Sequence, residues 1–406
     1  MHVVLIGARP EAVHAVLAGG HELTLLYEAW EDRRILALGD RVHRRCVVES
    51  PDILDAVWSA LHHVGAAPRR IDAVVAVAEY GVLPAAVIAR HVGARSLDPD
   101  VALRCRDKAV QKQAWRAAGV PTARWVVVPD ARLAPASARV AVAAAGLRPP
   151  FVVKPPARAG GIQVAIADDE AALDAIVRDH PSRRLIVEER NPGTEWHFDG
   201  VVEAGEISSF VVSPYLAPLI ETKAGRPQCS IALVPQDHAA LYAEAAALTR
   251  RALAATGLSD GVFHFEVFGE PASFVAGELA ARPGGSKISS VIERTIGVDM
   301  WAAATQIFTR DAIRRAPGPP RGTFGYTHLP SVPGRRNRVR QDDVERMPGV
   351  LEVQMTVAYD EEMPDMRRST STGVGVVVVE GDDFASCRSR MTDIVNLVNE
   401  INSSAA

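Results

Sequence analysis

The fold of this chain is decided by two stretches, Phe263-His264-Phe265-Glu266-Val267-Phe268 and Ala276-Gly277-Glu278-Leu279-Ala280-Ala281-Arg282-Pro283-Gly284-Gly285. Apolar residues alternate in both as they do in strands, and the turn residues Gly269-Glu270-Pro271 lie between them, which predicts a β-hairpin. Pairing across this hairpin brings the side chains of Glu266 and Glu278 close together. Two such carboxylates repel each other unless one is protonated or a cation lies between them. The hairpin therefore predicts a site for a hard cation such as Mg²⁺, which prefers carboxylate oxygens and keeps positions for water and phosphates.

Arg282 follows the second strand and adds a fixed fork of N–H donors. Such a fork suits a carboxylate or a developing oxyanion. A surface hairpin with ordinary exposed acids is the alternative interpretation of these residues. The remainder of the sequence favours a functional site, because residues suited to phosphate binding occur at strand ends before the hairpin.

Length and composition bound the class of protein. The chain has 406 residues, 48% of them hydrophobic, and a formal net charge of −4. This length favours two to four domains, and the charge gives no reason to expect a nucleic-acid partner. The wide spacing of the four cysteines favours reduced thiols in a cytoplasm. We expect no signal peptide and no membrane partner, because neither a charged leader with an apolar segment nor a membrane-length apolar run occurs.

The first hundred residues alternate between strand and helix patterns. Strands are expected at 3–6, 22–26 and 73–78, and helices at 10–18, at 53–64 and from Pro84 onward. This alternation predicts a parallel sheet with helices on both faces. The first turn, Gly7-Ala8-Arg9-Pro10-Glu11, lacks the G-x-G-x-x-G fingerprint, so a dinucleotide site is not expected.

The remainder of the chain mixes the two patterns. Helices are expected at 106–118, within 129–150, and at 169–178, 238–256 and 382–401. Strands are expected at 125–128, 151–154, 163–167, 185–189, 195–202, 207–212, 323–329, 349–359 and 374–380. Residues 125–188 have the size of a small separate module, and residues 317–320 are linker-like.

Lys154 ends a strand just before a loop of proline, arginine and glycine residues at 155–161. Backbone N–H groups in such loops, aided by an ammonium group, neutralise phosphate oxygens. Gly160 and Gly161 favour this interpretation, because glycine lets the backbone approach a ligand closely. A solvated strand end is the alternative, and the loop does not have the P-loop pattern.

Glu188 ends the next strand, and Gly193-Thr194-Glu195 follows shortly after. A carboxylate at a strand end can accept a hydrogen bond from an exocyclic amine, and a second carboxylate can hold ribose hydroxyls. Taken alone, each of these glutamates is more typical of an exposed position than of a binding site.

The ordered set of motifs resembles the ATP-grasp superfamily, in particular its carboxylate–amine ligases and, among them, the L-amino-acid ligases or dipeptide synthetases. The motifs that carry the resemblance are Arg106-Asp107-Lys108, Gly119-Val120-Pro121, Val153-Lys154-Pro155, Gly160-Gly161, Val187-Glu188-Glu189, Gly193-Thr194-Glu195, Glu266 and Glu278 to Arg282. The resemblance covers about residues 1–310 well and the C-terminal part loosely. It implies an α/β fold with α+β elements in ATP-grasp architecture. The implied parts are a Rossmann-like pre-ATP-grasp domain at 1–105, an ATP-grasp N-terminal part at 106–188 with a lid module at about 125–188, a catalytic part with the Mg²⁺ site at 189–316, and a β-rich C-terminal subdomain at 317–406.

The resemblance also implies roles for individual residues. The residues implied to bind ATP are Lys108, Lys154, Gly160, Gly161, Glu188, Glu189, Arg190 and Glu195. Glu266 and Glu278 are implied to bind Mg²⁺ or Mn²⁺, and Lys154 and Arg282 are implied to be catalytic. The residues implied to contact the substrate are Glu79, Arg282, Gly284, Gly285 and Ser286. Within the ATP site, Glu188 would receive the adenine amine and Glu195 the ribose. The loop at 156–162 would be the lid over the phosphates.

The implied reaction joins a carboxylate, expected to be that of an amino acid, to an amine through an acyl phosphate, with release of ADP and phosphate. One position departs from the family pattern E-x-N-x-R, because Ala280 stands where the asparagine ligand is usual. His264 or Ser286 could compensate for it.

Three alternatives stay open, namely a ligase that loads an amino acid onto a carrier protein, a purine-pathway ATP-grasp enzyme and an ATP-binding protein without turnover. A biotin carboxylase is disfavoured, because that family has a Q-V-E-H type stretch where this chain continues Pro283-Gly284-Gly285. The expected partners are small-molecule carboxylate and amine substrates. A homodimer is the expected assembly.

Overall fold

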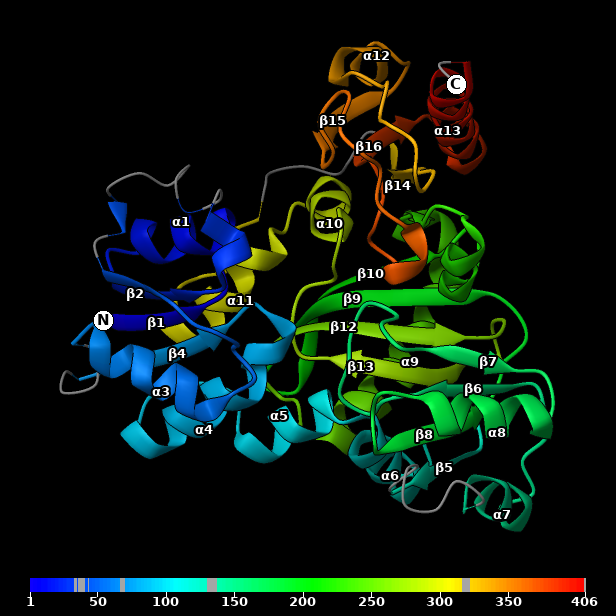
Figure 1. Ribbon diagram of the computed structural model, residues 1–406. Helices are drawn as coiled ribbons and strands as arrows, with labels where there is room; N and C mark the ends of the chain where they lie inside the picture. Colours follow the sequence, from blue (N-terminus) through cyan, green and yellow to red (C-terminus); the bar gives the residue numbers. More distant parts are fainter. Residues whose placement is uncertain are drawn as a thin grey trace.

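The computed structural model describes residues 1–32, 35, 41–42, 44–65, 70–129, 137–315 and 322–404, and their strands form four sheets of four strands each (Figure 1). In Figure 1 the sheet that contains β9, β12 and β13 lies between the strands β5 to β8 and the C-terminal elements. The N-terminal sheet lies to its side.

The N-terminal sheet is parallel, with the order β3-β2-β1-β4. Its strands are β1 His2–Ile6, β2 Glu22–Tyr27, β3 Arg44–Val47 and β4 Ala73–Ala76. Helices cover both faces, as predicted: α1 Pro10–Ala18 and α11 Met300–Thr309 contribute to the core on one face, α3 Leu54–His63 and α4 Val82–Val92 on the other. Helix α4 begins two residues before the proline that was expected to open it. Short 3₁₀ turns follow β2 at Ala29–Glu31 and β4 at Glu79–Gly81.

A small antiparallel sheet spans residues 125–189, where a separate module is predicted at about 125–188. Its order is β5-β8-β6-β7, from β5 Trp125–Val128, β6 Phe151–Lys154, β7 Ala165–Ala167 and β8 Leu185–Glu189. Helices α7 Ser137–Ala144 and α8 Glu170–Asp179 supply buried residues to its core. Strand β7 is shorter than predicted. Gln163 has a φ of 62°, outside the range of a strand.

The central sheet has the order β10-β9-β12-β13 and contains the predicted hairpin. Its strands are β9 Glu195–Glu203, β10 Glu206–Pro214, β12 Gly261–Phe268 and β13 Val275–Ala280. Residues of α5 Pro99–Arg106, α6 Lys108–Ala117 and α9 Ala239–Thr256 share its apolar core. Glu266 pairs directly with Glu278, and a β-bulge follows at Glu266 and Val267. The predicted hairpin register is therefore confirmed.

The C-terminal sheet has the order β11-β14-β16-β15. Its strands are β11 Cys229–Ile231, β14 Thr323–Leu329, β15 Val350–Met355 and β16 Gly375–Gly381. The other elements near it are α10 Ile288–Ile296, α12 Gln341–Glu345, α13 Phe384–Ser404 and the 3₁₀ segments Leu219–Ala224, Pro235–His238 and Met366–Arg368. Strand β15 is shorter than the predicted 349–359. The domain boundaries stay a prediction, and β11 shows that an earlier segment joins the C-terminal sheet.

Within the described residues, none of the helices combines the length and the apolar character that a membrane crossing requires. The four cysteines, Cys46, Cys105, Cys229 and Cys387, are free.

Candidate active site

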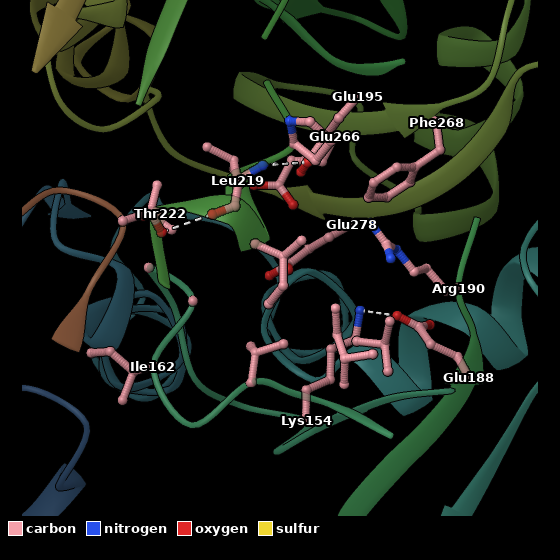
Figure 2. Close-up of a pocket in the computed structure, with 18 of the residues that line it drawn as sticks. Lys154, Ile162, Glu188, Arg190, Glu195, Leu219, Thr222, Glu266, Phe268 and Glu278 are labelled. Atoms are coloured by element: carbon pink, nitrogen blue, oxygen red, sulfur yellow. Dashed lines mark hydrogen bonds and ion pairs between the residues drawn. The ribbon is translucent and has the colours of Figure 1, made fainter. Parts of the chain in front are cut away.

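A cavity of about 570 Å³ is lined by the small antiparallel sheet, the central hairpin and the C-terminal part (Figure 2). Its volume is in the range of small-molecule and cofactor sites. Predicted site residues that line it are Lys108, Lys154, Gly160, Gly161, Glu188, Glu189, Arg190, Glu195, Glu266, Glu278 and Arg282. Glu79, Gly284, Gly285 and Ser286 are described residues that lie outside this lining.

The two hairpin carboxylates face different partners across the cavity. Nζ of Lys108 lies 2.8 Å from Oε1 of Glu278 and also donates to the carbonyl oxygen of Arg158, at 2.6 Å. Figure 2 shows Glu195 and Glu266 on one side, Glu188 and Lys154 on the opposite side, and Glu278 between them. The lysine that is predicted to meet phosphate thus neutralises a carboxylate that is predicted to hold a cation.

Glu188 is held between two buried ammonium groups. Lys154 pairs with its Oε1, and Nζ of Lys112 lies 3.0 Å from its Oε2. Burial raises the pKa of Glu188, but Lys112 and Lys154 outweigh it and lower the pKa to about 2. The adenine role of this carboxylate stays a prediction, since both oxygens already have ammonium partners.

Lys112 was missed by sequence reasoning, although a signal exists. It lies four residues after Lys108 on α6, and residues at this spacing share one helix face. Its side chain is 1% exposed, and burial lowers its pKa below the usual value despite Glu188. Lys112 therefore has a structural role, because it is the buried ion-pair partner of Glu188 in the cavity wall.

Glu195 brings a third carboxylate into the cavity. Its Oε2 accepts a hydrogen bond from the backbone N–H of Leu219, at 2.8 Å. Burial, and then the charge of Glu266, raise the pKa of Glu195 well above its usual range. Three glutamates, Glu195, Glu266 and Glu278, thus line the same cavity. The raised pKa favours a proton on Glu195. This donor set fits a hard divalent cation, whose charge would relieve the repulsion.

A buried His–Asp–His cluster lies behind Glu266. Nδ1 of His197 lies 2.6 Å from Oδ2 of Asp199, and Nδ1 of His264 lies 2.8 Å from Oδ1 of Asp199. Nε2 of His264 lies 3.7 Å from Oε1 of Glu266. Burial lowers the pKa of His264, but Asp199 and Glu266 outweigh it and raise the pKa to about 9. Sequence reasoning missed His197 and Asp199, although their alternate positions on one strand place both on the same face.

Glu79 and Arg282 meet although 203 positions separate them. Nε of Arg282 donates to Oε2 of Glu79, and Nη1 of Arg106 lies 3.6 Å from Oε1 of the same carboxylate. Burial raises the pKa of Glu79, but Arg282 and Arg106 outweigh it and hold the pKa below its usual range. The 3₁₀ turn after β4 thereby joins the N-terminal sheet to the end of the hairpin.

Comparisons with known proteins place this geometry in context. No family model matches the chain. The chain is 26% identical over 313 residues to the L-arginine-specific L-amino acid ligase of Bacillus subtilis, an alignment that covers 74% of this chain and 73% of that protein. Its fold matches the crystal structure of an L-amino acid ligase from Bacillus licheniformis with a TM-score of 0.75 at 16% identity, over 97% of each chain. It also matches a carboxyaminoimidazole ribonucleotide synthase from Aspergillus clavatus complexed with ATP, with a TM-score of 0.76 at 15% identity, over 98% of each chain.

The chain is thus similar in sequence to an L-amino acid ligase and similar in fold to ligases of ATP-grasp architecture. The predicted fold class, α/β with ATP-grasp architecture, is thereby confirmed.

The glycine-containing loop at 155–161 lies against the C-terminal part of the chain. The carbonyl oxygen of Gly160 accepts hydrogen bonds from the N–H of Thr370, at 3.1 Å, and from Oγ of Ser369, at 3.3 Å. The backbone N–H of Lys108 donates to the carbonyl oxygen of Pro156, at 2.9 Å. Ser369 and Thr370 line the cavity beside the loop. No sequence pattern indicated them, because they contribute through a contact between distant segments.

The remaining predicted substrate residues lie just beyond Arg282. Oγ of Ser286 lies 2.7 Å from Nε2 of His328, and burial lowers the pKa of His328 to about 4. Gly284 is packed so closely that an added Cβ would lie 2.9 Å from Oδ1 of Asp199. The segment after Arg282 thus contacts both the C-terminal sheet and the His–Asp–His cluster.

Proposed function

We propose that this protein is an ATP-dependent carboxylate–amine ligase that activates an amino acid as an acyl phosphate and transfers the acyl group to an amine. The observation that carries the proposal is the convergence of Glu266, Glu278, Lys108 and Lys154 on one cavity. The likeness to the L-arginine-specific L-amino acid ligase of Bacillus subtilis supports the substrate class.

The lysines supply the positive charge for a triphosphate. Lys154 reaches the cavity from the end of β6, and Lys108 reaches it from the start of α6. Phosphoryl transfer depends mainly on positioning and on neutralising charge at the transferring group. Two ammonium groups converging from different elements meet that requirement.

Glu266 and Glu278 would hold Mg²⁺, because carboxylate oxygens are the ligands this ion prefers. When bound, the ion would neutralise phosphate oxygens and align the nucleotide for attack by the substrate carboxylate. The protein residues fit this group, since Glu195, Glu266 and Glu278 form a carboxylate-rich wall in which Glu195 is driven to hold a proton. Mn²⁺ is the second candidate ion.

Arg282 would stabilise the oxyanion that forms when the amine attacks the acyl phosphate. Its guanidinium is oriented by Glu79 and also donates from Nη1 to the carbonyl oxygen of Pro283, at 2.8 Å. Preorganised donors of this kind lower a barrier by roughly 3 kcal/mol, because they need no reorganisation during the reaction. The loop at 156–162 would cover the phosphates and exclude water from the acyl phosphate.

The alternatives lead to distinguishable products. A carrier-protein ligase would need a protein as its amine or thiol acceptor, and a purine-pathway enzyme would need a ribonucleotide. An ATP-binding protein without turnover, which Ala280 suggests, would release no ADP with any mixture. Homodimerisation stays a prediction.

The test measures ADP and phosphate release from Mg-ATP with pooled L-amino acids, followed by mass spectrometry. The proposal predicts release that depends on the amino acids and a product lighter by one water than the sum of its two components. ATP binding without ADP release under all mixtures, including dipeptides and ribonucleotide amines, would favour the protein without turnover.

A further inference from the structure

His264 bridges the buried cluster and the cavity. Its Nδ1 lies 2.8 Å from Oδ1 of Asp199, its Nε2 lies 3.7 Å from Oε1 of Glu266, and the residue lines the cavity. One ring nitrogen is thus engaged by a buried carboxylate. The other faces a carboxylate that is proposed to bind a cation.

A second histidine, His197, holds the other carboxylate oxygen of Asp199, so the orientation of Asp199 toward His264 is fixed. Its second oxygen is taken by Nδ1 of His197 at 2.6 Å, and Nε2 of His197 lies 2.6 Å from Oγ of Ser230. That hydroxyl donates to the carbonyl oxygen of Pro214, at 3.0 Å. Both oxygens of Asp199 are therefore used. A histidine whose Nδ1–H donates to such a carboxylate presents Nε2 as a metal ligand in the usual arrangement of protein metal sites.

The distance between Nε2 and the Glu266 oxygen fits a shared ion. Ligand atoms lie about 2.0–2.2 Å from a small divalent cation, so two atoms of one ligand set lie at most about 4.4 Å apart. The observed 3.7 Å is inside this limit.

Ala280 offers no ligand atom opposite His264, so the imidazole nitrogen has no competing side chain across the hairpin. It is the direct cross-strand partner of His264, just as Glu278 is the partner of Glu266. Because an alanine side chain has no polar atom, the polar side-chain atom that this pair offers to the carboxylates is Nε2 of His264.

We propose that Nε2 of His264 is a third protein ligand of the cation held by Glu266 and Glu278, with Asp199 as its positioning residue. This inference rests on the proposed function, because it requires those two carboxylates to bind the cation. A mixed nitrogen and oxygen ligand set favours Mn²⁺ over Mg²⁺, since Mg²⁺ prefers oxygen ligands alone.

The experiment is pulsed electron paramagnetic resonance of Mn²⁺ bound to the full-length protein with a non-hydrolysable ATP analogue. The proposal predicts a nitrogen coupling typical of directly bound imidazole, which changes when the protein contains ¹⁵N-labelled histidine. His264→Gln is expected to abolish the coupling and to reduce the ratio of Mn²⁺ to Mg²⁺ affinity about tenfold or more. His197→Gln is the matched control, because His197 contacts the same Asp199 from the other side, and it is expected to retain the coupling.

The outcomes separate this inference from the proposed function. Nucleotide-dependent Mn²⁺ binding without a histidine coupling overturns the role of His264 and leaves the ligase proposal standing. Absence of nucleotide-dependent Mn²⁺ binding overturns both. Isotope labelling of the unaltered protein gives the decisive signal even if the His264 variant does not fold.

Discussion

Nζ of Lys108 lies 2.8 Å from Oε1 of Glu278, so a predicted phosphate ligand and a predicted cation ligand neutralise each other. The lysine comes from the first turn of α6 and the glutamate from β13. Their side chains are 6% and 21% exposed, so the pair is shielded from water and from screening by salt. Binding of a cation together with a triphosphate would give each of the two groups a new partner.

Glu278→Gln is expected to reduce ADP release by at least about a hundredfold, because the amide lacks the negative charge that the carboxylate brings to the cation. Turnover is measured at saturating ATP over a range of Mg²⁺ concentrations. Glu270→Gln is the control on the turn of the same hairpin, where the exposed side chain accepts a hydrogen bond from Thr194. Unchanged turnover in Glu278→Gln would remove this residue from the cation site.

Lys112→Met is expected to destabilise the protein by about 3 kcal/mol, because it removes one of the two ammonium partners of buried Glu188. Urea unfolding measures the loss. Arg139→Met breaks an exposed ion pair with Glu170 instead, and it is expected to leave the unfolding midpoint nearly unchanged. Equal midpoints for the two variants would contradict the structural role of Lys112.

Glu195 is expected to make the ligand-free protein less stable as pH rises. Its pKa in the folded protein is raised above 4.5 by burial and by Glu266, so the folded state binds a proton that the unfolded state has already released. The stabilisation is complete below the unfolded pKa and is lost as pH rises through the raised folded pKa. Thermal unfolding in chelator, from about pH 5 to about pH 8, should show a steeper decline for the unaltered protein than for Glu195→Gln. Parallel declines would be inconsistent with a proton on Glu195.

Gly161→Ala is expected to raise the KM for ATP several-fold by pushing the lid loop away from the C-terminal segment. An added Cβ would lie 2.9 Å from Cγ2 of Thr370, and Gly161 has a φ of 67°. Gly20→Ala is the control, since Gly20 has a φ of 71° with no atom within 4 Å of an added Cβ. Thr370→Ser removes the colliding methyl group and should restore part of the affinity in the double variant. If both glycine variants raise the KM equally, backbone strain rather than the lid contact is responsible.

The central hairpin could be predicted because its information is local. Glu266 and Glu278 are twelve positions apart, and the alternation of apolar residues with an intervening turn sets their pairing. The strand ends at Lys154 and Glu188 followed from patterns of the same kind. Lys112 could have been identified from its spacing of four residues from Lys108 on one helix, but it was not.

The other contacts join segments that no local pattern relates. Thr370 meets Gly160, and α11, which begins at Met300, packs on the N-terminal sheet, whose last strand ends at Ala76. The His–Asp–His cluster depends on the register between β9 and β12, in which His264 lies opposite Asp199. Alternation places each residue on a face of its strand, but neighbouring strands are chosen by tertiary packing. The sequence therefore predicted the carboxylates of the site but not the residues that position them.

The most direct test of the acyl-phosphate mechanism follows an oxygen atom from the substrate carboxylate to the released phosphate. The protein is incubated with Mg-ATP, an amine acceptor and an amino-acid substrate labelled with ¹⁸O in its carboxylate, and the released phosphate is analysed by mass spectrometry. Attack of the carboxylate on the γ-phosphoryl group followed by amine capture transfers one substrate oxygen to phosphate, so the released phosphate is expected to contain one ¹⁸O. Condensed product accompanied by phosphate without ¹⁸O would contradict the acyl-phosphate mechanism.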